Sequence, residues 1–220
     1  MKTFRLLTLA GLAVAAVSAN ALTLVTTRAG IGATDTIDWG QFGAAFTSLG
    51  TPINGVTSTY GLRFRASTTA TAAFERRDQW TGGWAGNFTQ GDELLWTKSP
   101  GVTTIRFASY VQAVGANIQD DFFGPFTATI EAFDGFGVSM GSFQVNGNSN
   151  SNNDGSAIFV GVASNAFNIA KITYQVQGAS GALDDFAINE VAMNACVPEP
   201  GTIAALGLGA IALIRRKRSK

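Results

Sequence analysis

Apolar and polar residues alternate with a period of two through much of the chain between Leu22 and Ala195. In residues 126–132, phenylalanine, alanine and isoleucine alternate with Thr127, Thr129 and Glu131. Residues 170–177 repeat the pattern, with Lys171 among the polar positions. A period of two is typical of a β-strand with one buried and one wet face, and such strands belong mainly to antiparallel sheets.

Further short apolar segments predict strands at residues 61–66, 94–97, 102–108, 111–118, 138–145, 157–162 and 183–192. They recur about every 8–12 residues without a long helical pattern between them, which is typical of sandwiches. We therefore expect an all-β fold, an antiparallel β-sandwich of jelly-roll type. The polar stretch at residues 147–155 predicts a mobile surface loop.

The first residues have the pattern of a secretory signal. Lys2 and Arg5 precede an apolar run at residues 6–17, and small residues follow at 18–21. A positive start, an apolar core and a small-residue exit are what a signal peptidase requires. Cleavage could follow Ala19 or Ala21; we favour Ala21, so residues 1–21 are expected to form a signal helix that is removed on export.

The last residues combine three features in a fixed order: Val197, Pro198, Glu199 and Pro200, then an apolar stretch from Ile203 to Ile214, then the basic cluster Arg215, Arg216, Lys217 and Arg218. This order resembles the PEP-CTERM sorting signal. The resemblance implies an exosortase-type processing enzyme as a partner and assigns residues 196–220 to a sorting signal.

The apolar part of this tail suits a transient membrane anchor. Gly201–Ile214 contains fourteen residues, which as a helix measure about 21 Å, whereas the hydrocarbon core of a bilayer is about 30 Å thick. The basic cluster should stay on the cytoplasmic side and stop transfer. We expect a membrane-anchored intermediate and then a protein at the cell surface or in the extracellular matrix; a plain C-terminal anchor without processing is the alternative.

A second, looser resemblance covers about residues 91–192. It rests on segments 114–118, 126–134, 157–162 and 185–189, which resemble the extracellular domain often found ahead of this sorting tail. That resemblance implies a jelly-roll sandwich at residues 22–195 without an assigned reaction. Asn189 stands where the last of these motifs often has aspartate.

Charge and composition exclude several functions. Residues 22–197 contain 8 basic and 14 acidic residues, a net charge of 8 − 14 = −6, which disfavours nucleic acid as a partner. With no histidine and one cysteine, the protein lacks the usual zinc ligands, histidine-based triads and any internal disulfide. We therefore expect a protein without catalytic residues and without a required cofactor.

Aspartates in predicted loops suggest one candidate metal site. Asp121, Asp134 and Asp185 could supply oxygen ligands to a structural calcium ion. The alternative, which we favour, is that these aspartates stabilise turns through local hydrogen bonds.

Two tryptophans in a glycine-rich segment, Trp80 and Trp84, are candidates for stacking on sugar rings, and would make the domain a carbohydrate-binding module with polysaccharide as its partner. Core packing is the alternative for both. A carboxylate-dependent glycoside hydrolase would need two facing carboxylates about 5–10 Å apart. The chain offers Glu75, Glu93, Glu131 and Glu190, but the sequence cannot bring two of them together.

Overall fold

The computed structural model describes residues 21–80 and 83–196, and the predicted signal helix and C-terminal helix lie outside this range. The described chain is all-β and antiparallel. Two short 3-10 helices, η1 (Arg28–Ile31) and η2 (Trp39–Phe42), accompany the strands. The strands are β1 (Leu22–Val25), β2 (Asp35–Ile37), β3 (Ile53–Thr57), β4 (Arg63–Thr68), β5 (Glu75–Asp78), β6 (Glu93–Trp96), β7 (Thr103–Asp120), β8 (Gly124–Phe133), β9 (Ser139–Ser149), β10 (Ile158–Ser164), β11 (Ile169–Gln177), β12 (Leu183–Asp184), β13 (Phe186–Ile188) and β14 (Val191–Ala195).

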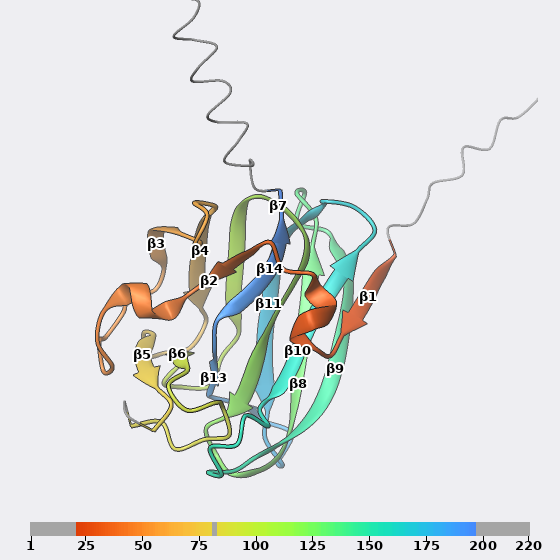
Figure 1. Ribbon diagram of the computed structural model, residues 1–220. Helices are drawn as coiled ribbons and strands as arrows, with labels where there is room; N and C mark the ends of the chain where they lie inside the picture. Colours follow the sequence, from red (N-terminus) through yellow and green to blue (C-terminus); the bar gives the residue numbers. More distant parts are fainter. Residues whose placement is uncertain (1–20, 81–82, 197–220) are drawn as a thin grey trace, which may run out of the picture.

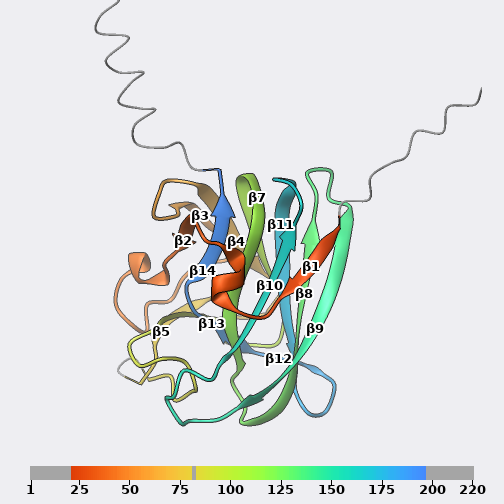
Figure 2. The same ribbon diagram turned by 45° about the vertical axis from the view of Figure 1, so that its right-hand side comes forward.

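The long strand β7 belongs to both layers of the molecule. Its first half pairs with β4 and β11, and its second half pairs with β10, β13 and β14. Between the halves, Ala108, Ser109 and Tyr110 are exposed at a corner. Strands that turn a corner in this way carry the chain from one sheet to the other. The β8 layer thus contains β3, β4, β7, β11, β8 and β9, and the β10 layer contains β1, β10, β7, β14 and β2, with β13, β6 and β5 beyond (Figures 1 and 2).

The predicted strand faces are confirmed. Ile130 in β8 and Ile172 in β11 are fully buried, as are their apolar neighbours at every second position, whereas Lys171 and Glu131 point outward. The buried side chains of both layers form one main core cluster, which includes Phe126, Val160 and Tyr174. Burial of this apolar surface is the main force that holds the layers together.

The structure contains four strands that the pattern did not predict, β1, β2, β3 and β5, and it differs from the predicted elements in three further places. Residues 102–108 and 111–118 fall in one long strand, β7, whose pairing with β11 shifts register at the corner, between Arg106 and Val111. Strand β9 runs to Ser149, which pairs with Gly124, so the polar stretch begins inside a strand. Residues 183–192 are divided among β12, β13 and β14, which pair with β11, β6, β7 and β2.

The strands have two distinct ends. At the end that we call the terminal end, β1 begins and β14 finishes, and the corner of β7 and the β8–β9 turn lie beside them (Figure 1). At the opposite, distal end lie the β7–β8 turn, the chain between β9 and β10, and the β11–β12 turn.

Candidate functional site

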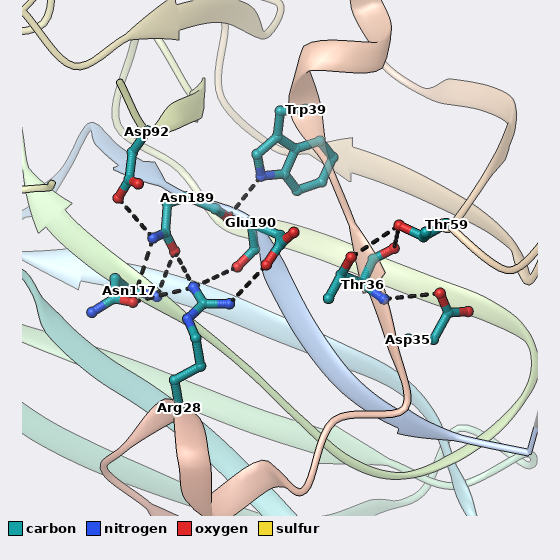
Figure 3. A network of polar contacts seen from close by, with 9 residues as sticks. All are labelled: Arg28, Asp35, Thr36, Trp39, Thr59, Asp92, Asn117, Asn189 and Glu190. Carbon is teal, nitrogen blue, oxygen red and sulfur yellow. Dashed lines mark hydrogen bonds and ion pairs between the residues drawn. The ribbon is translucent and has the colours of Figure 1, made fainter. Parts of the chain in front are cut away.

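A polar pocket opens beside the β13–β14 junction. Its volume is about 400 Å³, and it is lined by Arg28, Asp38, Thr89, Gly91, Asp92, Glu93, Asn117, Asn189 and Glu190. These residues come from η1, from the chain before η2, from the segment that leads into β6, from β7 and from the junction itself. Figure 3 shows that several of their side chains converge on one point.

Asn189 is the centre of this network. Its Oδ1 accepts hydrogen bonds from Nη2 of Arg28 (2.8 Å) and from the backbone N–H of Asn117 (2.9 Å). Its Nδ2 donates to Oδ2 of Asp92 (3.0 Å), and its carbonyl accepts from Nε1 of Trp39 (2.8 Å) (Figure 3). Because the amide both donates and accepts here, asparagine suits this position better than a carboxylate, which can only accept when ionised.

Arg28 holds the network together from the other side. Its Nη2 also donates to Oδ1 of Asn117 (3.2 Å) and to the carbonyl of Glu190 (2.9 Å), while Nη1 donates to Oε1 of Glu190 (3.2 Å). The N-cap Thr27 fixes the start of η1 by accepting from the backbone N–H of Gly30. A planar guanidinium with several bonds of this kind is rigidly oriented.

A carboxyl pair closes one wall of the pocket. Burial raises the pKa of Glu93, and the hydrogen bond to Asp38 together with that residue's charge raises it further, whereas Arg76 lowers it. Since two neighbouring carboxylates resist simultaneous ionisation, Glu93 retains a proton to higher pH than a free glutamate. The pocket therefore offers carboxyl groups, amides and one guanidinium.

Two of the four glutamates named from the sequence meet in this pocket. Glu93 and Glu190 line it together, whereas Glu131 lies on the outer face of the β8 layer and Glu75 forms ion pairs with Arg77 and Lys98. Sequence reasoning missed Arg28, Asp92 and Asn117 as partners of Asn189. The one local signal was the aspartate-containing motif that ends at Asn189.

Four aspartates gather at the distal end, at positions 120, 121, 184 and 185. Burial, followed by the charge of Asp184, raises the pKa of Asp120 to about 7. Burial and the charge of Asp185 raise the pKa of Asp121 to about 6. Burial also raises the pKa of Asp185, although the indole N–H of Trp96 donates to its Oδ2 at 2.8 Å and acts in the opposite direction. The distal end thus holds an acidic cluster with few compensating charges.

The structure does not bring the three candidate calcium ligands together. Asp121 and Asp185 are neighbours at the distal end, where the backbone N–H of Asp121 donates to the carbonyl of Asp185. Asp134 lies at the terminal end, because β8 runs the length of the sheet between them, and its carboxylate accepts from the backbone N–H groups of Phe136 and Val138 (both 2.9 Å). In residues 21–80 and 83–196, no group of three or more acidic, histidine or cysteine side chains is arranged to hold a metal ion.

The two candidate stacking residues have different surroundings. Trp84 is 4% exposed, packs edge-on against Trp96 (5.9 Å between ring centroids) and lies in a small core cluster with Phe88 and Leu94. Its ring faces are therefore not available to a sugar. Trp80 is 47% exposed and has a positive φ of 64°. Sugar stacking remains a prediction for Trp80 alone.

The predicted sorting residues, Val197, Pro198, Glu199 and Pro200, and the stop-transfer residues Arg215, Arg216, Lys217 and Arg218 lie outside the described residues, as does the signal peptide. Across the part of the chain that the structure describes, no helix has the length and hydropathy needed to span a membrane.

Solved structures show only distant likeness to the chain. A DUF4465 family protein from Bacteroides caccae is 11% identical, with a TM-score of 0.39 over 68% of this chain and 87% of that one. The module TmCBM61 in complex with β-1,4-galactotriose is 14% identical (TM-score 0.29; 59% and 86% covered). The family 11 carbohydrate-binding module from Clostridium thermocellum is 9% identical (TM-score 0.30; 71% and 100% covered). Scores this low assign no ligand or activity to this chain.

No curated protein matches the sequence. One family model does, the PEP-CTERM protein-sorting motif, and it matches residues 197–218. This range contains all the predicted sorting and stop-transfer residues, directly after the last residue of the sandwich that the structure describes. The chain therefore carries a PEP-CTERM sorting motif at its C-terminal end.

Proposed function

We propose that this is an exported, non-enzymatic protein of the cell surface or extracellular matrix, delivered and processed through its C-terminal motif. A signal peptidase removes residues 1–21, and an exosortase-type enzyme acts at Val197–Pro200 while the tail is held in the membrane. The match to the sorting motif at residues 197–218 carries this proposal. The domain at residues 22–195 is the delivered part, and we propose the jelly-roll type of β-sandwich for it, which its two antiparallel layers fit.

Two physical features support a processed tail. The apolar stretch Gly201–Ile214 is short for a permanent membrane span, and five basic residues follow it. The exposed Cys196, directly before the motif, lies at an end of the sandwich rather than in its core. A membrane-embedded enzyme can therefore reach the segment without unfolding the domain.

Mass spectrometry of the mature protein from its host, combined with cell fractionation, tests the proposal. The expected protein lacks residues 1–21 and the basic tail, and it is recovered from the surface or matrix. Replacing Arg215, Arg216, Lys217 and Arg218 by serine should let unprocessed chain pass through the membrane. Pro198→Ala combined with Glu199→Ala should leave the chain anchored and uncut. Wild-type protein found only in membranes with its tail intact would contradict the proposal.

A second candidate function is binding of a hydroxyl-rich ligand, such as a glycan, in the pocket around Asn189. The observation that favours it is the lining of carboxylates, amides and one guanidinium, since such groups orient a polar ligand through several hydrogen bonds. A glycan array read for both binding and cleavage products tests it. Hits that Asp92→Asn weakens would support a binding module, cleavage that Glu93→Gln abolishes would indicate a hydrolase instead, and an array without hits would exclude both for the glycans tested.

A further inference from the structure

The basic residues of the domain fall into two groups of four. Arg28, Arg76, Arg77 and Lys98 all form ion pairs with nearby carboxylates. The other four lie on the outer face of the β8 layer: Arg63, Arg65, Arg106 and Lys171. None of these four forms an ion pair within residues 21–80 and 83–196. In a domain with a net charge of −6, acidic partners are plentiful. The only acidic side chain that the described part of this face presents near the row, Glu131, forms no ion pair with these four cations, which needs an explanation.

Three of these cations form a row across neighbouring strands. Arg65 in β4 lies directly opposite Arg106 in β7, and Arg106 lies directly opposite Lys171 in β11. The next position in the row is Phe133 in β8, whose ring lies 3.5 Å below Nζ of Lys171. The nearest acidic residue along β8, Glu131, accepts a hydrogen bond from the hydroxyl of Ser139 (2.5 Å). Like charges placed opposite one another destabilise a sheet, so this row has a cost that the fold does not require.

The row adjoins the point where the chain leaves the sandwich. Arg63 and Cys196 line the same hollow of about 410 Å³. Arg106 lies between two further hollows: one, of about 270 Å³, also contains Arg63 and Arg65, and the other, of about 290 Å³, also contains Tyr110. The arginines are therefore accessible, next to the start of the sorting motif.

Exposed apolar side chains surround the same terminal end. Phe136 in the β8–β9 turn is 94% exposed, and Tyr110 at the corner of β7 is 50% exposed. The turns β3–β4, β10–β11 and β8–β9 add three more: Tyr60, Phe167 and Val138. Aromatic side chains beside arginine and lysine are the combination that settles at the boundary between headgroups and water.

The distal end also exposes aromatic side chains in the β7–β8 turn, but its charge is opposite, because it carries the cluster of Asp120, Asp121, Asp184 and Asp185. An anionic surface would attract the terminal end and repel the distal end, so the charge distribution alone would orient the domain. Six residues separate Cys196 from Ile203, where the apolar stretch begins. Fully extended, they reach about 20 Å, which keeps the terminal end close to the bilayer for as long as the tail is held in it.

We propose that the terminal end of the β8 layer, with Arg63, Arg65, Arg106, Tyr110 and Phe136, is a contact surface for anionic lipid headgroups. It holds the tethered domain in a fixed orientation at the membrane before the tail is processed. This proposal rests on the membrane-held intermediate of the proposed function. Arginine binds lipid phosphates in the hollows beside Arg106, and the exposed aromatic rings enter the interface.

The test uses the full chain with Cys196→Ser, reconstituted through its own tail into phosphatidylcholine vesicles with or without phosphatidylglycerol. A fluorescent probe is attached at Phe136→Cys in one sample and at Phe122→Cys, at the distal end, in another. Lipids with a quencher in the headgroup report contact. We expect phosphatidylglycerol to increase quenching at position 136 and to leave position 122 unquenched.

Charge variants identify the groups responsible. Arg106→Glu should lower the lipid-dependent population in contact by at least about fivefold, the effect of one cation near an anionic surface. The matched control is Gln144→Glu with Asn148→Asp on the exposed face of β9, which changes the net charge equally without removing a cation. The control variant should retain the quenching.

The outcomes are separable by flotation of the vesicles. A chain that does not float would overturn the membrane-held intermediate and this contact together. A chain that floats but shows no phosphatidylglycerol-dependent quenching at position 136 would overturn the contact and leave the proposed function standing. If the arginines of this face bind a soluble acidic polysaccharide but do not bind anionic vesicles, the face binds a polymer and the lipid proposal is wrong.

Discussion

The two ends of the sandwich concentrate opposite charges, and each does so without the partners that would stabilise it. At the terminal end, Arg65, Arg106 and Lys171 lie side by side without an ion pair among the described residues. At the distal end, burial and the charges of neighbouring aspartates raise the pKa values of Asp120, Asp121 and Asp185. In contrast, Arg76 is almost fully buried and forms ion pairs with Asp78 and Glu93.

This contrast distinguishes charged residues that stabilise the fold through ion pairs from charged residues that do not stabilise it. A buried ion pair cannot lose one partner without leaving an uncompensated charge. An exposed row of like charges can be removed without harm to the fold, because like charges placed opposite one another destabilise a sheet. The contact surface proposed above gives the row a role outside the fold.

The largest effect is expected from a charge placed on the wrong face of β11. Ile172 is fully buried and its neighbour Lys171 faces outward. Ile172→Asp should unfold the domain, because an unpaired buried charge costs about 3–5 kcal/mol or more, a large part of the stability of an ordinary domain. Ile130→Asp in β8 should do the same. Lys171→Asp is the matched control and should change the free energy of unfolding by less than about 1 kcal/mol. Circular dichroism of the variants checks this, and a folded Ile172→Asp would mean that the strand faces are reversed.

The next effect concerns the pocket. Asn189→Asp should lower the free energy of unfolding at pH 7 by about 2–3 kcal/mol, because a carboxylate would replace the amide that donates to Asp92 at 3.0 Å. Adding Asp92→Asn should restore much of the loss, since the new amide can donate to the new carboxylate. Urea denaturation of both single variants and the double variant measures the coupling. Equal losses with and without Asp92→Asn would show that this hydrogen bond does not set the preference for asparagine.

The acidic cluster should make stability depend on pH. The pKa of Asp120 is raised to about 7 in the folded protein. The contribution of Asp120 to the free energy of unfolding is therefore complete below the ordinary pKa of an aspartate and is lost as the pH rises through about 7. Asp120→Asn should therefore stabilise the domain by about 1–3 kcal/mol at pH 8 relative to the wild type, and have little benefit at pH 4. Melting curves at the two pH values provide the measurement. A gain at pH 4 that equals the gain at pH 8 would contradict a charge effect.

The strand faces could be predicted from the sequence because alternation is a local property. In residues 126–132 and 170–176, the place of a residue in the alternation predicts whether its side chain is buried or exposed, whichever strand lies beside it.

The pocket could not be predicted in this way. Arg28 and Asn189 are 161 residues apart and meet only because β14 pairs with β2 and β7. Trp80 and Trp84 show the same limit: they are four residues apart in a glycine-rich segment, yet one is exposed and the other is buried under β6, because pairing of Gln79 with Trp84 fixes the fold of the segment.

The smallest effect tests the central premise that the basic row is not structural. Arg106→Gln removes the middle cation, which lies opposite both Arg65 and Lys171, so relief of the repulsion should raise the free energy of unfolding by about 0.2–1 kcal/mol at low salt. The gain should shrink at high salt, where screening weakens repulsion between exposed charges. Arg76→Gln is the opposite case and should destabilise the domain, because it strands the carboxylates of Asp78 and Glu93. Thermal melting at two salt concentrations measures both variants. If Arg106→Gln were as destabilising as Arg76→Gln, the row would be part of the fold, and the asymmetry between the two ends would no longer point to a partner.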